Sequence, residues 1–316
     1  MTRTAADLGE VGVIERLKRR LPTTSAVVVG IGDDAAVLRP TGGRELLFAS
    51  DMLVEGVHFD PPRGTGRRRT PARAIGWKAL ACNVSDIAAM GGVPLAAVAS
   101  LGCPPSTPVA WLDGLTRGLR ACAARFKMAV VGGDTVRAPR VVLDVAILGT
   151  VPRGRAVLRS GAKVGDRLFV TGRLGGSLAS PAGGGASGRH ATFTPRLREA
   201  QWLVRHLPVH AMMDLSDGLA SDAWQMARAS RVTLRLDAAH IPVAVAARTL
   251  SHALMDGEDF ELLFAVPPRA AGRVPARIGS VPVTEIGRVV RRGIGVELVK
   301  ADGRITNIIP TGFKHF

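Results

Sequence analysis

Several acidic residues of the 316-residue chain directly follow short apolar runs and stand beside glycine or other small residues. A single carboxylate at the end of a strand can simply cap a helix or stabilise a turn. Capping accounts less well for the whole set, because it would not require so many acidic residues immediately after buried strands. The set therefore raises the hypothesis that these carboxylates meet at one site. Its members are Asp33, Asp34, Asp51, Asp134, Asp214, Asp217, Glu258 and Asp259.

Carboxylates that converge require a cation, because like charges a few ångströms apart cannot all remain ionised. Mg²⁺ suits them, since it prefers oxygen ligands and completes its octahedral shell with water and substrate phosphates. Asp86 fits the same pattern, because on a helix expected to end near residue 90 it shares a face with small and apolar residues. The three cysteines, Cys82, Cys103 and Cys122, match neither a CxxC pair nor a zinc cluster and are expected to be reduced and buried. The acidic residues thus indicate hard-metal phosphate chemistry.

The familiar phosphate-binding and hydrolase motifs are missing from the sequence. It contains no GxxxxGK[ST], no GxGxxG between a strand and a helix, no GxSxG and no HExxH. Phosphates could still be bound by the backbone N–H groups of glycine turns, such as Gly132–Gly133, and by a fixed cation such as Arg159. The well-known kinase folds are therefore disfavoured, whereas phosphate binding is not.

The net charge of +16 suggests a polyanionic partner, either a nucleic acid or a phosphorylated small molecule. Aromatic residues make up only 4% of the chain and tyrosine is absent, which leaves few platforms for stacking single-stranded bases. The densest basic run, at 63–73, is a loop interrupted by glycine and proline. We expect most arginines to form a solvated surface. A non-catalytic nucleic-acid-binding protein stays as an alternative, which a salt-titrated binding assay would detect.

The elements that must position these residues form an alternating pattern of strands and helices. With 47% hydrophobic and 22% charged residues the chain is of globular composition, and its 37 glycines and 20 prolines suit the many tight loops of an α/β protein. It has neither a long apolar run nor a secretory signal, which predicts a cytoplasmic protein. Helices are expected at 5–20, at 70–90 and at 107–125, the last two opened by Thr-Pro pairs. Strands are expected at 27–32, 45–50, 94–100, 128–133 and 141–151.

A glycine-punctuated stretch at 151–166 separates two domains, 1–150 and 151–316. In the second half we expect strands at 167–172, 211–216, 232–236, 260–266 and 283–290. Helices are expected to start at Thr194–Pro195, to be capped by Ser216, and to lie near 242–254. The predicted fold class is α/β (α+β), with a mixed sheet flanked by helices in each domain.

Seven motifs, taken in order, span nearly the whole chain. They are GIGDDAAV (30–37), SDMLVEGVHF (50–59), KALACNVSDIAAMGGVP (78–94), VVGGDTVRA (130–138), GRAVLRSGAKVGD (154–166), DLSDGL (214–219) and GEDFELLF (257–264). In this order they resemble the thiamine-monophosphate kinases, a family related to aminoimidazole ribonucleotide synthetase and selenophosphate synthetase.

The resemblance implies an enzyme of thiamine diphosphate biosynthesis that phosphorylates thiamine monophosphate with ATP and several Mg²⁺ ions. It also implies a homodimer whose N-terminal domains, which bind ATP and Mg²⁺, pair into a barrel-like sheet. We expect direct in-line transfer of the γ-phosphoryl group, because the acceptor phosphate is already a nucleophile near neutral pH. No covalent enzyme intermediate and no strong general base are then needed.

The resemblance also assigns residues. Those that match the family's metal positions are Asp34, Ser50, Asp51, Asp86, Asp134, Asp214 and Asp217, with Ala49 where the family often has serine. Catalysis is expected to depend on Asp51, Asp86, Asp134 and Asp214. Those that match nucleotide contacts are Gly133, Asp134, Arg159 and Ser216, and those that match substrate contacts are His58, Glu258 and Phe313.

Three positions depart from the family pattern. Ala49 and Ser50 replace more usual hydroxyl residues, and Asp256 replaces a glycine beside the substrate carboxylate Glu258. These changes bear on substrate affinity more than on ATP binding. A phosphate-activating synthetase of the same superfamily is an alternative, although selenophosphate synthetases have a reactive cysteine or selenocysteine near the N-terminus, and the first cysteine here is Cys82. The hydrogenase-maturation relatives end in cysteine, whereas this chain ends KHF.

Overall fold

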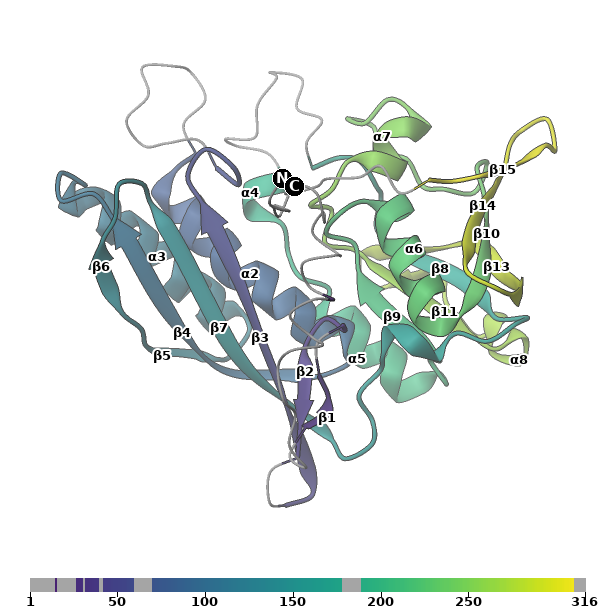
Figure 1. Ribbon diagram of the computed structural model, residues 1–316, viewed down its shortest axis with the longest axis horizontal. Helices are drawn as coiled ribbons and strands as arrows, with labels where there is room; N and C mark the ends of the chain where they lie inside the picture. Colours follow the sequence, from purple (N-terminus) through teal and green to yellow (C-terminus); the bar gives the residue numbers. More distant parts are fainter. Residues whose placement is uncertain are drawn as a thin grey trace, which may run out of the picture.

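The computed structural model describes residue 15 and residues 27–30, 32–39, 42–59, 70–177 and 189–309 (Figure 1). Within these ranges the chain forms two mixed β-sheets, each with helices packed against it. The expected fold class is confirmed. Three sequence expectations lie wholly or mostly outside the described residues: the helix at 5–20 (except Glu15), most of the basic loop at 63–73, and Phe313.

The first sheet has seven strands, with β3 and β7 at its centre. Its members are β1 (Val27–Val29), β2 (Ala36–Leu38), β3 (Arg44–Val54), β4 (Val93–Cys103), β5 (Ala129–Gly132), β6 (Thr135–Arg137) and β7 (Val142–Pro152). The order is β1-β2-β3-β7-β4-β5, with β6 also paired to β4. β3 and β7 pair antiparallel along their whole length, from Arg44 opposite Pro152 to Val54 opposite Val142. This long ladder fixes the position of Asp51 in the middle of the sheet.

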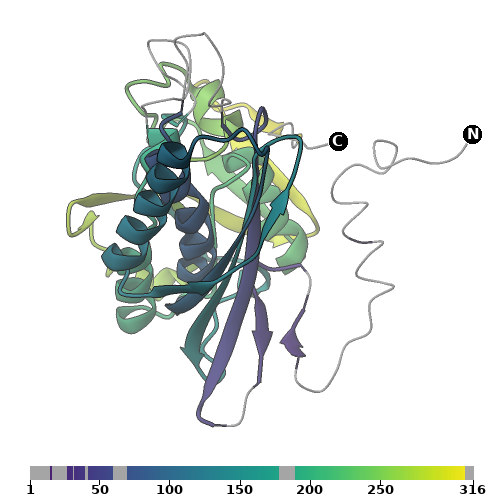
Figure 2. The same cartoon turned by 90° about the vertical axis from the view of Figure 1, so that its left-hand side faces the viewer.

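Two helices, α2 (Ala72–Ala89) and α3 (Val109–Arg125), cover one face of this sheet (Figures 1 and 2). The two helices pack closely because glycine on one helix lies against the backbone of the other. A Cβ on Gly76 of α2 would lie 2.0 Å from the carbonyl oxygen of Leu115 on α3. The expectation that Thr70 and Thr107 cap these helices was wrong by one residue. Pro71 and Pro108 are themselves the N-cap residues, with extended backbones, so the preceding threonines do not cap the helices.

The second sheet has eight strands in the order β15-β14-β10-β13-β8-β11-β9, with β12 paired to β13. They are β8 (Arg167–Thr171), β9 (Ala211–Asp214), β10 (Val232–Asp237), β11 (Leu262–Val266), β12 (Arg277–Ile278), β13 (Val281–Arg292), β14 (Gly295–Val299) and β15 (Ile305–Asn307). The helical segments are η1 (Arg159–Gly161), α4 (Arg189–Thr192), α5 (Leu197–His206), α6 (Leu219–Ser230), α7 (Leu250–Met255) and α8 (Pro268–Ala271).

Some helix starts in this half differ from expectation. The N-cap of α6 is Gly218, whose φ of 101° favours glycine, so Ser216 does not cap that helix. The helix after Thr194–Pro195 begins only at Leu197. The helix expected near 242–254 is reduced to the short α7, since the preceding residues form turns.

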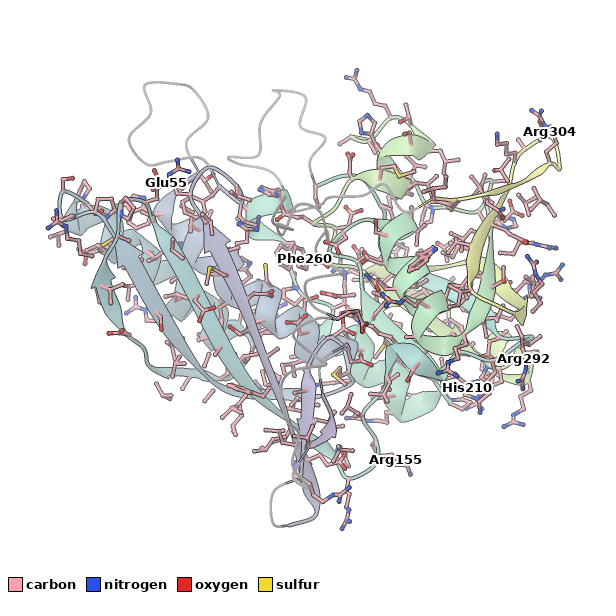
Figure 3. The ribbon with its side chains drawn as sticks, in the orientation of Figure 1. Glu55, Arg155, His210, Phe260, Arg292 and Arg304 are labelled. Atoms are coloured by element: carbon pink, nitrogen blue, oxygen red, sulfur yellow. The ribbon has the colours of Figure 1, made fainter. Side chains whose placement is uncertain are left out.

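One buried apolar cluster crosses from the first sheet into the second half. It joins Ile87 of α2 and Ile147 of β7 to Met212 of β9 and Phe264 of β11. Phe260, at the centre of the molecule in Figure 3, stacks on Phe193 with ring centroids 3.9 Å apart. Helix α2 is buried on nearly all sides because both halves pack against it. Side chains on α2 are therefore placed where both halves can reach them.

Among the described residues, none of the helices combines the length and the apolar character needed to cross a membrane.

Candidate metal and phosphate site

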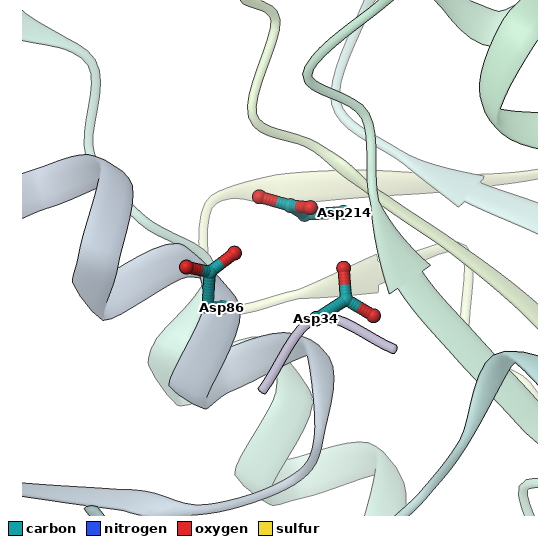
Figure 4. Close-up of side chains that lie close together, drawn as sticks. All are labelled: Asp34, Asp86 and Asp214. Carbon is teal, nitrogen blue, oxygen red and sulfur yellow. The ribbon is translucent and has the colours of Figure 1, made fainter. Parts of the chain in front are cut away.

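Three carboxylates from distant parts of the sequence meet at the junction of the two halves (Figure 4). Asp34 precedes β2, Asp86 lies in the last turns of α2, and Asp214 ends β9. One oxygen from each lies within 4.8 Å of the other two. Mg²⁺ has bonds of about 2.1 Å to its oxygens in an octahedral shell, so ligand oxygens about 3–4 Å apart suit it. The oxygen-only donor set fits a hard cation, and the predicted convergence of these three residues is found.

Arg159 supplies the positive charge nearest to this cluster. At the start of η1, its Nε donates to Asp34 Oδ2 at 3.1 Å and its Nη2 to Asp34 Oδ1 at 2.9 Å. Its backbone N–H donates to Asp33 Oδ2 at 3.2 Å. Burial opposes the charge on the guanidinium, but Asp34 and Asp33 outweigh it and raise the pKa of Arg159. The Arg159 side chain is thus fixed on one carboxylate of the three-residue cluster.

The cluster holds more negative charge than its cations offset. Burial, followed by the charges of Asp51 and Asp214, raises the pKa of Asp86 well above its ordinary value. Burial, followed by the charge of Asp34, does the same for Asp214, although Ser85 Oγ donates a hydrogen bond to Asp214 Oδ2 and partly opposes the shift. Both groups therefore hold a proton up to a higher pH than an ordinary aspartate, and a cation that binds here would compete with that proton.

Asp51 belongs to the same electrostatic group. It lies in β3 opposite Val145. Burial raises its pKa to about 6, with further contributions from Asp144, Asp217 and Asp34 and an opposing one from Lys78. Asp51 therefore interacts electrostatically with both Asp34 of the three-carboxylate cluster and Asp217, and its role as a metal ligand stays a prediction.

Ser50 and Ala49 occupy opposite faces of β3. Ala49 is on the same face as Asp51, because side chains alternate along a strand. Ser50 points to the outer face, where its Oγ donates to Asp144 Oδ1 at 2.9 Å. The Ser50 hydroxyl thus points away from the three-carboxylate cluster, so Ser50 could contact a metal on that face only through its backbone.

Asp134 and Gly133 lie in the turn between β5 and β6. Asp134 is exposed, and its Oδ1 accepts a hydrogen bond of 2.7 Å from the Thr135 N–H. It is not part of the three-carboxylate group. A Cβ on Gly133 would lie 1.8 Å from the Ala99 carbonyl oxygen, so close backbone packing alone requires glycine here. The structure leaves the roles of these two residues as predictions.

The turn after β9 brings Ser216 and Asp217 to the junction. The Ser216 carbonyl accepts a hydrogen bond of 2.6 Å from the Glu258 N–H. The Asp217 N–H donates to Asp222 Oδ2 at 3.1 Å. Asp222, on the first turn of α6, is buried, and burial followed by Asp217 and Asp214 raises its pKa. The segments of the two motifs at 214–219 and 257–264 are thus joined by a backbone hydrogen bond.

Four residues near the site escaped the sequence assignments: Asp33, Asp144, Asp222 and Lys78. Asp33 was among the carboxylates that follow apolar runs, but it matched no ligand position. Asp222 carried one usable signal, since an acidic residue in the first turn of a helix often accepts hydrogen bonds from the preceding loop. Asp144 lies inside a strand with no local signal, and Lys78, although it opens the 78–94 motif, received no role from it; only their tertiary neighbours identify what they contact.

The expected substrate residues His58 and Glu258 lie beside Lys78. Its Nζ donates to Glu258 Oε1 at 2.7 Å and to the His58 carbonyl oxygen at 3.1 Å. The His58 ring accepts a hydrogen bond of 3.0 Å at Nδ1 from the Val54 N–H. The two residues are therefore close to one another, although Glu258 is already paired with a cation.

We expect the stability of the metal-free protein to fall as pH rises. Burial, assisted by Asp34 and opposed by Arg159, raises the pKa of Asp33 to about 7, and that of Asp51 is about 6. The folded state thus binds these protons more tightly than the unfolded chain, whose carboxyls titrate near pH 4. Their contribution to the free energy of unfolding is complete below about pH 4, and it is lost as the pH rises through the pKa values of these two groups in the folded state.

Mg²⁺ should oppose this loss, so the rise in Tm on adding Mg²⁺ should be larger at pH 8 than at pH 5. Calorimetry at the two pH values, with Mg²⁺ or with a chelator, measures the difference. An equal rise in Tm at both would contradict the coupling of metal and proton at this site.

Comparisons with known proteins identify the family and the fold of the chain. Residues 32–151 match the family model of the AIR synthase related protein, N-terminal domain, and residues 163–300 match that of the C-terminal domain. The thiamine-monophosphate kinase of Synechococcus elongatus is 34% identical, with 99% of this chain and 98% of the relative covered. That of Rhodopirellula baltica is 36% identical, with 97% of each covered. The solved structure of AaThiL complexed with AMPPCP and TMP superimposes with a TM-score of 0.84 at 31% identity, covering 100% of both chains.

Proposed function

The chain belongs to the thiamine-monophosphate kinase family of AIR synthase related proteins, and from that membership we propose its reaction. It transfers the γ-phosphoryl group of ATP to thiamine monophosphate, with thiamine diphosphate and ADP as products. The observation that carries the proposal is the meeting of Asp34, Asp86 and Asp214 beside Arg159. The complex of the relative AaThiL with AMPPCP and TMP supports ATP and thiamine monophosphate as the two substrates.

Asp34, Asp86 and Asp214 would hold Mg²⁺, with Asp51 and Asp217 adjoining them. When bound, Mg²⁺ neutralises charge on the transferred and leaving phosphate oxygens. Arg159 holds Asp34 in place and offers its remaining N–H groups toward a phosphate. The further metal contacts proposed are Ala49 and Ser50, through their backbone, and Asp134; the further nucleotide contacts proposed are Gly133 and Ser216.

The proposed mechanism is direct in-line transfer. The terminal phosphate of thiamine monophosphate is partly or fully dianionic near neutral pH and is itself the nucleophile, so no residue needs to act as a strong base. The contribution of the chain is to align the two phosphates and to surround them with fixed charges. His58, Glu258 and Phe313 are the proposed contacts of the thiamine substrate.

The test is direct. Purified protein with ATP, Mg²⁺ and thiamine monophosphate should form thiamine diphosphate, whereas thiamine and aminoimidazole ribonucleotide precursors should give no phosphorylated product. Consumption of an aminoimidazole precursor in place of thiamine monophosphate would favour a synthetase of the same superfamily. We also propose a cytoplasmic location, where ATP is supplied, and a division into domains 1–150 and 151–316.

We further propose a homodimer formed through the first sheet. The face opposite α2 and α3 exposes large apolar side chains, including Phe48 (45% exposed), Met52 (52%) and Leu95 (54%). An apolar surface on one sheet face favours a partner that covers it. A second copy would supply the same face and bring the two sheets together into a barrel-like arrangement.

Leu95→Lys should shift the protein from dimer to monomer, because a buried lysine without a partner is costly at such an interface. Light scattering coupled to size-exclusion chromatography measures the mass directly. Val245→Lys, at a position that is 89% exposed in the second half, serves as the control and should leave the mass unchanged. A wild-type protein that is monomeric at micromolar concentration would refute the dimer.

A further inference from the structure

The buried ammonium group of Lys78 connects the two residues proposed to contact the thiamine substrate. Lys78 lies on α2, and its side chain is only 1% exposed. Its Nζ donates to Glu258 Oε1 at 2.7 Å, to Glu258 Oε2 at 2.9 Å and to the His58 carbonyl oxygen at 3.1 Å. His58 follows β3 in the first half, and Glu258 precedes β11 in the second. The Lys78 ammonium group therefore links a segment of the first half, at His58, to a segment of the second half, at Glu258.

His190 completes the arrangement around Glu258. Its Nε2 lies 3.3 Å from Lys78 Nζ, and because an ammonium group can only donate, this nitrogen is the acceptor. The other ring nitrogen, Nδ1, contacts Glu258 Oε2. The backbone of Glu258 is also held, since its N–H donates to the Ser216 carbonyl at 2.6 Å and its φ is 63°. The carboxylate is thus fixed by two side chains and by its own backbone.

This pairing changes what Glu258 can do for a cationic substrate. Burial alone would raise the pKa of Glu258, but the hydrogen bond from His190 and the charge of Lys78 outweigh burial and lower it. Glu258 is therefore ionised, while Lys78 compensates its charge. Such a carboxylate acts as an oriented acceptor rather than as a free counter-ion, and its orientation depends on Lys78.

We propose that Lys78 is a positioning residue of the acceptor site, which sets the affinity for thiamine monophosphate through Glu258 and the His58 backbone. The inference rests on the proposed function, which places these two residues against the thiamine substrate. Removing the ammonium group leaves a buried carboxylate with one fewer donor, so Glu258 takes up a proton more readily and is free to turn. The lost interaction is on the acceptor side, and ATP affinity should be preserved.

The experiment compares Lys78→Met, Glu258→Gln and the double variant with the wild type. Lys78→Met should raise KM for thiamine monophosphate at least about tenfold, a loss of about 1.4 kcal/mol or more, and leave KM for ATP within about twofold. Its KM for thiamine monophosphate should worsen further from pH 8.5 to pH 6, because Glu258 without Lys78 is protonated at higher pH than in the wild type. The double variant should be no worse than Glu258→Gln within about threefold, since Lys78 acts through Glu258.

Lys163→Met, which removes an exposed lysine, is the matched control and should leave both KM values unchanged. The positioning role would be overturned if the fold increases in KM of the two single variants multiplied in the double variant. It would also be overturned if Lys78→Met raised KM for thiamine monophosphate and KM for ATP equally. If Lys78→Met fails to fold, the double variant still tests the proposal, because it has no unpaired buried charge at these two positions. A KM for thiamine monophosphate far above that of Glu258→Gln would then overturn the positioning role of Lys78. A wild-type protein that forms no thiamine diphosphate would refute the proposed function instead, while calorimetric titration with thiamine monophosphate would still report on Lys78.

Discussion

Asp86→Asn is expected to lower turnover by about three orders of magnitude and, at the same time, to stabilise the metal-free protein. Turnover should fall because asparagine offers one neutral carbonyl oxygen in place of a carboxylate that we propose as a Mg²⁺ ligand together with Asp34 and Asp214. Stability should rise because Asp86 is ionised only against burial and against the charges of Asp51 and Asp214, as the direction of its raised pKa shows.

The two effects have opposite signs, which separates a functional loss from misfolding. Steady-state formation of thiamine diphosphate at saturating Mg²⁺ measures the first, and Tm in the presence of a chelator measures the second. Asp113→Asn, which changes an exposed aspartate on α3, is the control and should alter neither quantity. Near wild-type turnover of Asp86→Asn at saturating Mg²⁺ would exclude this cluster as the metal site.

Arg159→Met should destabilise the fold and abolish most activity. The Asp34 side chain is fully buried in this pair, and it accepts two parallel hydrogen bonds from the guanidinium. Breaking a buried ion pair by removing one partner typically costs about 3–5 kcal/mol, because the other charge is left uncompensated. We expect kcat/KM to fall by at least about a hundredfold, since Asp34 is then free to move away from Asp86 and Asp214.

Arg159→Lys should rescue little of this loss. A lysine restores the charge but not the planar fork that donates from Nε and Nη2 at once. The control is Arg304→Met, at the far edge of the second sheet in Figure 3, where an exposed pair with Asp302 should contribute little to stability. Urea unfolding measures the stabilities. If Arg159→Met and Arg304→Met were equally stable, the pair with Asp34 would not support the site.

Much of the site was predictable because its residues stand at recognisable places in the chain. Asp34 and Asp214 adjoin short apolar strands, and Asp86 lies on a face of small residues in a long helix. Their number, their neighbours and the lack of cysteine or histidine clusters were enough to predict a hard cation. The order of the seven motifs was enough to predict the family.

Other features were beyond the reach of local patterns. Helix α6 starts after Gly218 rather than at Ser216, because the preceding loop is held by Glu258, a residue about forty positions away. Asp144 on a regular strand has no distinctive neighbours in sequence, and the 78–94 motif that Lys78 opens does not reveal its partners. Their partners come from distant elements, so only the folded chain shows what they contact.

The sequence by itself determined the fold class and the family, since these depend on periodicity, on residue types and on the order of motifs; it also predicted the kind of ligand, a hard cation with phosphate. The tertiary structure decided which carboxylates are actually in contact, that Arg159 is bound to Asp34, and that Glu258 is already paired with Lys78. Distances and compensating charges between remote residues follow from packing.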